Sequence, residues 1–314
     1  MFQLFQNIFG SGADTKGRYP ESLVTMAIER ALEGTDARMR LLPGYAKKLR
    51  LAVVHAIDHV VDMIDRLPSP VSATSAGYDA SPELAAFFYS AARMTDILGK
   101  DQAWRAFREA NAGYAGPAVA LLLAAREEKH TFGYALVDDK PVSDVAQTVV
   151  AFNHPVLRDV CREEVDTRRL LRRRAFDYLL GIALARMEEK QSERSNLTQR
   201  RAVMRAKLSL LQKGSGFAQG DGENPAALQS KLEVVEQELK QLGADDTVLA
   251  SNLAILSEVL SAAETYFWLT ESTLHLVAQH VLHDKVDAGT TTVILRDLCD
   301  GQGHRASALL LALP

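Results

Sequence analysis

Apolar residues recur at intervals of three and four over much of the first 130 positions, which is the period of a helix with one buried face. Prolines and glycines divide this stretch into separate segments. We expect helices over 20–34, 43–67, 81–99, 101–111 and 117–128, with Ser81 as an N-cap and a Pro/Ser/Ala/Gly-rich linker at 68–80.

The pattern changes after residue 130, where short stretches rich in Val, Thr, Tyr and Phe predict strands. TFGYALVDD (131–139) and SDVAQTVVAFN (143–153) are separated by KPV. Near the end of the chain, residues 290–300 and 304–314 flank GQG, whose glycines suit a tight turn. Two hairpins, far apart in the sequence, are therefore expected in one small antiparallel sheet.

Between the predicted hairpins, leucines and valines repeat with heptad spacing. The series Leu228, Leu232, Val235 and Leu239 continues in the same phase from Leu249 onward. The segment before it, from about 157 to 213, is also helical in pattern, and a glycine-rich turn at 214–224 separates the two. Their opposite net charges favour pairing with each other over pairing with their own copies, so we predict an antiparallel coiled coil.

The predicted fold class is α+β and mainly α. A base would contain the helical region at 20–129 and the hairpins at 130–156 and 288–314, and it would carry a coiled-coil helical hairpin at 157–287. Residues 1–19 form a separate apolar segment and loop. Whether a helix continues through Gly243 stays open, because a glycine inside a helix costs only about 1 kcal/mol.

Composition narrows the functional classes without choosing one. The chain is 47% hydrophobic and 24% charged with a net charge of −4, which is ordinary for a globular protein and lacks the basic excess of a nucleic-acid binder. It has two cysteines, no apolar run near the ~20 residues of a membrane span, and no basic region at its start. A cytoplasmic location is therefore expected.

The stretch VVHAIDHVVDMID (53–65) contains the residues best suited to a metal site. His55, His59 and Asp62 lie on the helix face opposite to the apolar stripe, and paired histidines four residues apart can bind a divalent ion. The same residues also suit a solvated polar face stabilised by weak contacts between histidine and aspartate. We favour the solvated face and keep the metal site as an alternative.

The run TRRLLRRRAF has the highest local density of positive charge. Arg168, Arg169, Arg172 and Arg173 would form one patch on a helix, and such a patch can bind phosphate or another anion. Acidic residues one turn earlier and on the predicted partner helix offer intramolecular ion pairs instead. We favour the intramolecular pairs.

The first nine residues, MFQLFQNIF, place Phe2, Phe5 and Phe9 on one helical face. An aromatic face of this kind is expected to be covered by protein or by a membrane surface. No Lys or Arg precedes residue 16, which weakens the membrane interpretation, because interfacial helices usually carry cationic residues. Docking on protein is the preferred interpretation.

These features together favour a non-enzymatic interaction protein. It would bind a protein partner through the coiled-coil hairpin or through Phe2, Phe5 and Phe9, and we predict no cofactor and no nucleic acid. A homo-oligomer is left open. The alternatives are a metal-dependent enzyme built on His55, His59 and Asp62, and a peripheral membrane protein anchored by the N-terminal phenylalanines.

Overall fold

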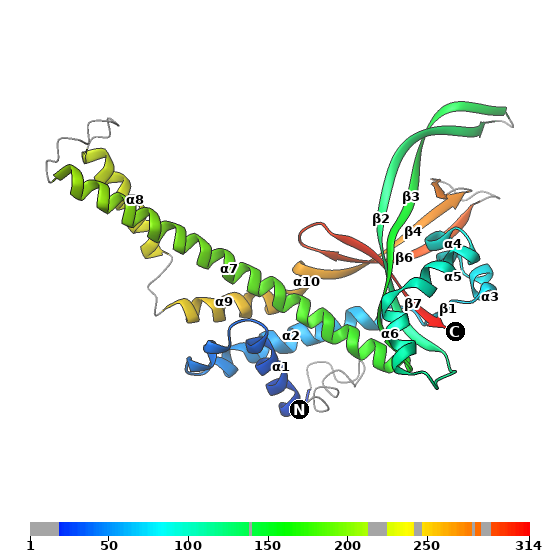
Figure 1. Ribbon diagram of the computed structural model, residues 1–314, viewed down its shortest axis with the longest axis horizontal. Coiled ribbons are helices and arrows are strands. Elements are labelled where there is room, and N and C mark those ends of the chain that lie inside the picture. The colour runs from blue at the N-terminus through cyan, green and yellow to red at the C-terminus, as the bar shows by residue number, and fades with distance from the viewer. Residues whose placement is uncertain (1–18, 138–139, 213–224, 242–246, 278–279, 284–289) are drawn as a thin grey trace. The chain divides into compact units, whose positions relative to one another are not determined.

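The computed structural model describes residues 19–137, 140–212, 225–241, 247–277, 280–283 and 290–314 (Figure 1). The chain divides into two compact units. We call one the helical unit, formed by Pro20–His55 and Asp177–Ser261, and the other the sheet unit, formed by Ala56–Phe176, Ala262–Pro314 and the described end of Met1–Tyr19. Helices α2 (Tyr45–Asp65) and α7 (Glu164–Gln212) each contribute one part to each unit.

The helical unit is built from amphipathic helices. Its further elements are α1 (Glu21–Glu33), the 3-10 helix η3 (Ala37–Leu41), α8 (Pro225–Gln241) and α9 (Val248–Ser261). On α1 and α9 the buried residues follow helical spacing, as in Leu253, Leu256 and Leu260. On α7 the buried stripe runs to Met187 and resumes at Leu197, and every residue between them is polar. The packed face of α7 is therefore interrupted over 188–196.

The sheet unit contains one seven-stranded sheet in the order β1-β7-β2-β3-β5-β4-β6. The strands are β1 (Val71–Ser72), β2 (Ala118–Val137), β3 (Lys140–Cys161), β4 (Phe267–Val277), β5 (Val281–Leu282), β6 (Thr291–Asp300) and β7 (Arg305–Leu313). β1 and β7 are parallel, and the other pairs are antiparallel. β6, the last strand in this order, also pairs with β7, the second strand.

The core of the sheet unit lies on one face of this sheet. Every second residue of β2 points into it, namely Ala118, Ala120, Leu122 and Ala124. The unit's helices are α3 (Ser75–Ala80), α4 (Pro82–Phe88), α5 (Ala91–Lys100), α6 (Gln102–Ala110) and α10 (Ala263–Tyr266). From α4 to α6 the core takes Leu84, Phe87, Phe88, Met94, Leu98 and Trp104. Asp101 caps α6 and also accepts a hydrogen bond from Leu157 N of β3, which ties that helix to the sheet.

The distal part of the β2–β3 hairpin extends beyond the rest of the sheet (Figure 1). β7 pairs with β2 only as far as Ala125, and β5 pairs with β3 only at Thr148 and Val149. We call residues 126–137 of β2 with residues 140–152 of β3 the β arm. Over most of its length the two strands of the β arm pair with each other alone among the described strands.

Three β-bulges bend β3 along this hairpin. The register with β2 shifts at three places, and at each of them β3 has a residue with positive φ: Asp159 (53°), His154 (51°) and Asp144 (59°). Asp and His enter the left-handed region more readily than most residues, and a bulge increases the local twist. The bulges thereby curve the hairpin without any glycine at these positions.

Asp144 gives a test of this backbone strain, because its side chain is exposed. Relief of left-handed strain is worth about 1–2 kcal/mol and the added entropy of glycine costs about 0.5–1 kcal/mol, so Asp144→Gly should stabilise the β arm by about 0.5–1 kcal/mol. Hydrogen exchange of amides 145–150 is expected to slow accordingly. Asp144→Val should accelerate it, and equal exchange in the two variants would contradict the assigned bulge.

Several expectations from the sequence are confirmed. The helices predicted over 20–34, 43–67 and 101–111 correspond to α1, α2 and α6, and both predicted hairpins are present as β2–β3 and β6–β7. Ser81 accepts a hydrogen bond from Leu84 N and caps α4, as expected. The segment predicted as one helix over 81–99 forms two, α4 and α5, because Tyr89 adopts φ 55°.

The predicted fold class is wrong in its main feature, the long antiparallel coiled-coil hairpin at 157–287. Only α7 is a long helix among the described residues, and the return path is divided between α8 and α9, with 242–246 outside them. Leu228, Leu232 and Val235 are buried on α8, whereas Leu253 and its neighbours are buried on α9. The heptad pattern on the two sides of Gly243 therefore belongs to two separate helices, α8 and α9. Gly243 itself lies outside the described residues.

Two strands of the structure lie in segments that the sequence predicted to be helical. The stretch predicted as a helix over 117–128 is the start of β2, and residues 267–277 within the predicted hairpin are β4. The small sheet expected at the base is accordingly larger, with seven strands. In β2 an apolar run from Ala118 to Ala125 lies between β7 and β3, and a run that is apolar at every position does not distinguish a buried strand from a helix.

Candidate functional site

The structure confirms the two faces of α2 that the sequence predicts. Val53, Ile57 and Val60 are buried, and His55 is exposed on the other side. His59 Nε2 lies 2.6 Å from the carbonyl oxygen of Phe267 at the start of β4. Among the residues that the structure describes, no three His, Cys, Asp or Glu side chains are grouped so that they could hold a metal ion. A metal site at His55, His59 and Asp62 stays a prediction without structural support.

Asp58, on the same face of α2, fixes the described end of the N-terminal segment. The Tyr19 hydroxyl donates a hydrogen bond to Asp58 Oδ1 at 2.8 Å. Burial raises the pKa of Tyr19 far above its usual value, and the hydrogen bond to Asp58 raises it further. Phe2, Phe5 and Phe9 lie outside the described residues, so docking through them stays a prediction. Across the described chain, none of the helices combines the length and apolar character that crossing a membrane requires.

The arginine run is engaged within the protein. Arg168 donates to the carbonyl oxygens of Ile64, Leu67 and Pro68 at the C-terminal end of α2. Arg169 pairs with Asp166 and Arg172 with Asp65. Arg173 also has an interaction partner. These contacts favour the intramolecular interpretation, and anion binding at these residues stays a prediction.

A histidine with a lowered pKa lies elsewhere in the sheet unit. The His280 ring stacks on Tyr89, with centroids 4.1 Å apart, and the Arg93 guanidinium lies over the Tyr89 ring. Burial lowers the pKa of His280, because a buried imidazolium loses its hydration. The folded protein therefore holds this ring neutral at pH values where the unfolded chain begins to protonate it.

A pH prediction follows for His280. Its folded pKa lies below the unfolded value of about 6.5, so its stabilising contribution is complete above pH 6.5 and declines as the pH falls through the folded pKa. Urea unfolding at pH 7.5 and pH 5.5 should show a smaller loss of stability in His280→Asn than in the unmodified protein. Equal losses would contradict the lowered pKa.

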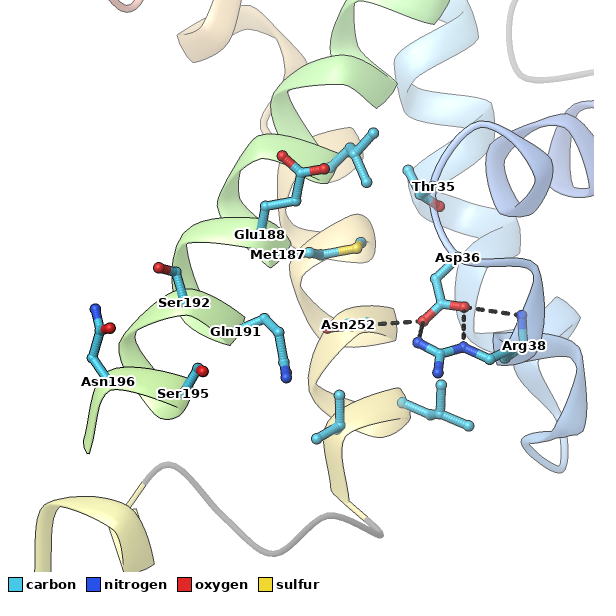
Figure 2. A pocket seen from close by; sticks show the side chains of 13 residues that line it. Thr35, Asp36, Arg38, Met187, Glu188, Gln191, Ser192, Ser195, Asn196 and Asn252 are labelled. Atoms are coloured by element: carbon cyan, nitrogen blue, oxygen red, sulfur yellow. Dashed lines mark hydrogen bonds and ion pairs between the residues drawn. The ribbon is translucent and has the colours of Figure 1, made fainter. Parts of the chain in front are cut away.

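The helical unit contains an open groove of about 950 Å³ between η3, α7 and α9. Figure 2 shows Arg38 joined to Asp36, with Asn252 of α9 on the other side of that carboxylate, while Gln191, Ser192, Ser195 and Asn196 project from α7. The Arg38 hydrogen bonds lower the pKa of Asp36. The lining has no histidine, cysteine or tyrosine. Its Asp36–Arg38 pair is satisfied internally, and Glu188 is a further carboxylate of the lining, on α7.

The β arm is the most unusual surface of the sheet unit. Phe132 is 74% exposed and Tyr134 is 79% exposed. Because alternate residues of a strand share a face, both rings lie on the face that carries Ala120, Leu122 and Ala124 into the core. That face of β2 continues beyond the helices, and the two aromatic side chains lie on the continued part.

The base of the β arm is fixed by charge. Arg126, the first arm residue of β2, has a side chain that is 5% exposed and donates from Nη1 to Asp297 Oδ2 at 2.8 Å and to Ser272 Oγ at 2.9 Å. Asp297 of β6 also pairs with Arg305 and accepts from Ser307. The base is therefore a buried polar cluster, and the exposed aromatics lie six and eight residues farther along β2.

The sequence contains a signal for this surface, although none of the predicted site residues belongs to it. Phe132 and Tyr134 alternate with Thr131 and Gly133 in a stretch predicted as a strand. Two aromatic residues on one face of a strand are normally covered. Only the register shows that β7 ends before them and leaves them uncovered. Comparisons with family models, with curated proteins and with solved structures found no match.

Proposed function

We propose that this protein is a non-enzymatic interaction protein that binds another protein chain through the β arm. The observation that carries the proposal is the exposure of Phe132 and Tyr134 on a hairpin that extends past its own sheet. This placement replaces the coiled-coil hairpin, which the described residues do not form, as the binding element.

The physical argument is that the β arm is costly for an isolated chain. A two-stranded ribbon is marginally stable in water, and exposed aromatic rings add an unfavourable interaction with solvent. Aromatic side chains on a rigid element are also the residues that contribute most to protein interfaces. A binding role accounts for both the length of the hairpin and the identity of its exposed side chains.

A cytoplasmic location belongs to the same proposal. It is supported by Cys161 and Cys299, which are both free and half-buried, since free thiols are typical of a reducing compartment. Burial also raises the pKa of the Cys161 thiol, which favours its unreactive protonated form.

Photo-crosslinking tests the proposed function. Benzoylphenylalanine placed at position 132 or 134, in the cells that naturally make the protein, should form covalent adducts with a second polypeptide. The matched control is position 51, because Leu51 is 80% exposed on a helix and has no proposed role. Adducts at 132 and 134 but not at 51 support the proposal. Absence of adducts at both arm positions would refute it.

The two rings should also dominate the affinity. Serine at both positions leaves the backbone of β2 unchanged and removes the aromatic anchors, and each anchor of this kind is worth about 2 kcal/mol. Phe132→Ser with Tyr134→Ser should therefore abolish the adducts formed from a benzoylphenylalanine at His130, an exposed residue on the same face of β2. Circular dichroism of the variant should be unchanged, since both side chains are exposed.

A further inference from the structure

The backbone hydrogen-bond pattern shows which residues of the β arm face an open edge. Asp300 N donates to His304 O at 3.1 Å, which fixes the alternation along β6 and β7. Even-numbered residues of β7 then face β6, and Ala312 O, which accepts from Ala73 N of β1, agrees with this assignment. Odd-numbered residues of β7 face β2.

Since odd residues of β7 pair with even residues of β2, the even residues of β2 direct their N–H and C=O groups toward the β7 side. Beyond Ala125 no described strand occupies that side. Glu128, His130 and Phe132 therefore present backbone donors and acceptors along an open edge. The Tyr134 carbonyl accepts one hydrogen bond from the Gln147 side chain, and its second lone pair can accept from the open edge.

An open strand edge is complementary to another extended strand. We propose that this edge of β2 pairs with the same edge of a second copy of the chain, antiparallel and centred on Phe132. The proposal rests on the proposed function of the β arm as a protein-binding element, and it specifies the partner.

The length of the edge supports this register. The open part of β2 runs from Arg126 to Val137, so its midpoint falls beside Phe132. A two-fold axis at Phe132 places Val137 of one copy opposite Glu127 of the other. Ala306 of β7 is already opposite Ala125, so the position after it belongs to Arg305. The described part of each open edge, from Glu127 to Val137, would then pair with the same part of the other copy.

The side chains support the same register. Phe132 would lie opposite its own copy, and His130 opposite Tyr134, so six aromatic rings would share one face; cross-strand aromatic pairs are favourable. Antiparallel registers centred on Glu127, Glu128 or Lys129 would set like charges directly opposite each other, which is unfavourable. The charged residues near the base of the β arm thus disfavour registers in which the two copies of β2 pair over a shorter length.

Proline at residue 130 tests the edge itself. His130 directs its N–H outward, so His130→Pro removes a donor for the second copy while the β2–β3 ladder keeps its hydrogen bonds. Sedimentation equilibrium should show a dimer whose dissociation constant rises about 100-fold in His130→Pro and about 3-fold or less in His130→Ala, a difference of about 2 kcal/mol or more. His130→Ala is the matched control, because it removes the same side chain and keeps the N–H.

Cysteine crosslinking gives a readout that does not depend on the folding of the proline variant. Across the two-fold axis the two Cα atoms of residue 132 would be about 5.5 Å apart, which suits a disulfide. Phe132→Cys should form disulfide-linked dimers under mild oxidation. Lys129→Cys should not, because its two copies would be about 20 Å apart along the strands.

The outcomes separate this proposal from the proposed function. A dimer that His130→Pro dissociates and that Phe132→Cys crosslinks supports the proposal. A monomer at all accessible concentrations overturns it, and so does a dimer that neither variant affects. Photo-adducts at position 132 with a different protein, in the absence of a dimer, would retain the proposed function and overturn the second copy as the partner. If neither photo-adducts nor a dimer forms, the proposed function and the proposed dimer are both overturned.

Discussion

Replacing Asp297 with alanine is expected to lower the free energy of unfolding by about 3 kcal/mol, because it leaves the buried Arg126 guanidinium with only the partly exposed Glu128, at 3.3 Å, as a carboxylate partner. The Asp297 side chain is fully buried and accepts from Arg126 at 2.8 Å and from Arg305 at 2.8 Å. Arg305 is 39% exposed at its side chain and can be solvated, whereas Arg126 is 5% exposed and cannot. The loss arises chiefly at Arg126, whose buried charge keeps only the longer pair with Glu128.

Urea unfolding of Asp297→Ala and of Asp96→Ala compares the loss of the same side chain from a buried ion pair and from an exposed one. Asp96 forms an exposed ion pair with Lys100 one turn away on α5, and such a pair is worth about 0.5 kcal/mol. If the buried charge of Arg126 is the cause, adding Arg126→Met to Asp297→Leu should recover much of the loss. An equal cost for the two alanine variants would contradict the assigned burial.

The parts of the fold that could be predicted from the sequence are those specified by neighbouring residues. Ser81 followed by Pro82 predicts a helix start, and α4 begins there with the Ser81 side chain accepting from Leu84 N. The GQG turn likewise predicts the β6–β7 hairpin, and Gly303 has a φ of 88° within it. These features depend on local geometry, so distant residues do not change them.

The parts that failed depend on distant partners. β2 begins with an apolar run that either a helix or a doubly covered strand could contain, and its coverage comes from β7, nearly two hundred residues later. The leucines of α8 and α9 share a heptad phase, yet Leu260 of α9 and Leu228 of α8 are buried on different helices. Spacing identifies the buried face of a helix and not the element that covers it.

The candidate site shows the same limit. His55 and His59 were predicted as site residues because histidines can bind metal. The proposed binding surface instead consists of Phe132, Tyr134 and the open backbone edge of β2. No residue type marks an open strand edge, because the edge is defined by where the neighbouring strand ends. β7 begins at Arg305, and its register with β2 ends at Ala125, before Phe132 is reached.

Arg168→Ala is expected to lower the free energy of unfolding by about 2–4 kcal/mol. Its guanidinium donates to Ile64 O at 2.7 Å, to Leu67 O at 3.0 Å and to Pro68 O at 3.1 Å. Ile64 lies in the last turn of α2, and Leu67 and Pro68 follow the helix, where backbone acceptors lack helical partners and positive charge is favourable. The side chain is 15% exposed, so the carbonyls lose a charged donor that water replaces only in part.

Arg169→Ala is the matched control, because it lies next in the same run and on the same helix. Arg169 pairs with Asp166, which is 50% exposed, and its Nε has no hydrogen-bond partner among the described residues. Its loss should cost less than about 1 kcal/mol. An anion site would instead make both residues contribute to phosphate-dependent stabilisation and neither to stability without phosphate. Urea unfolding in buffers with and without phosphate therefore decides whether this run of arginines serves the α2 terminus or a ligand.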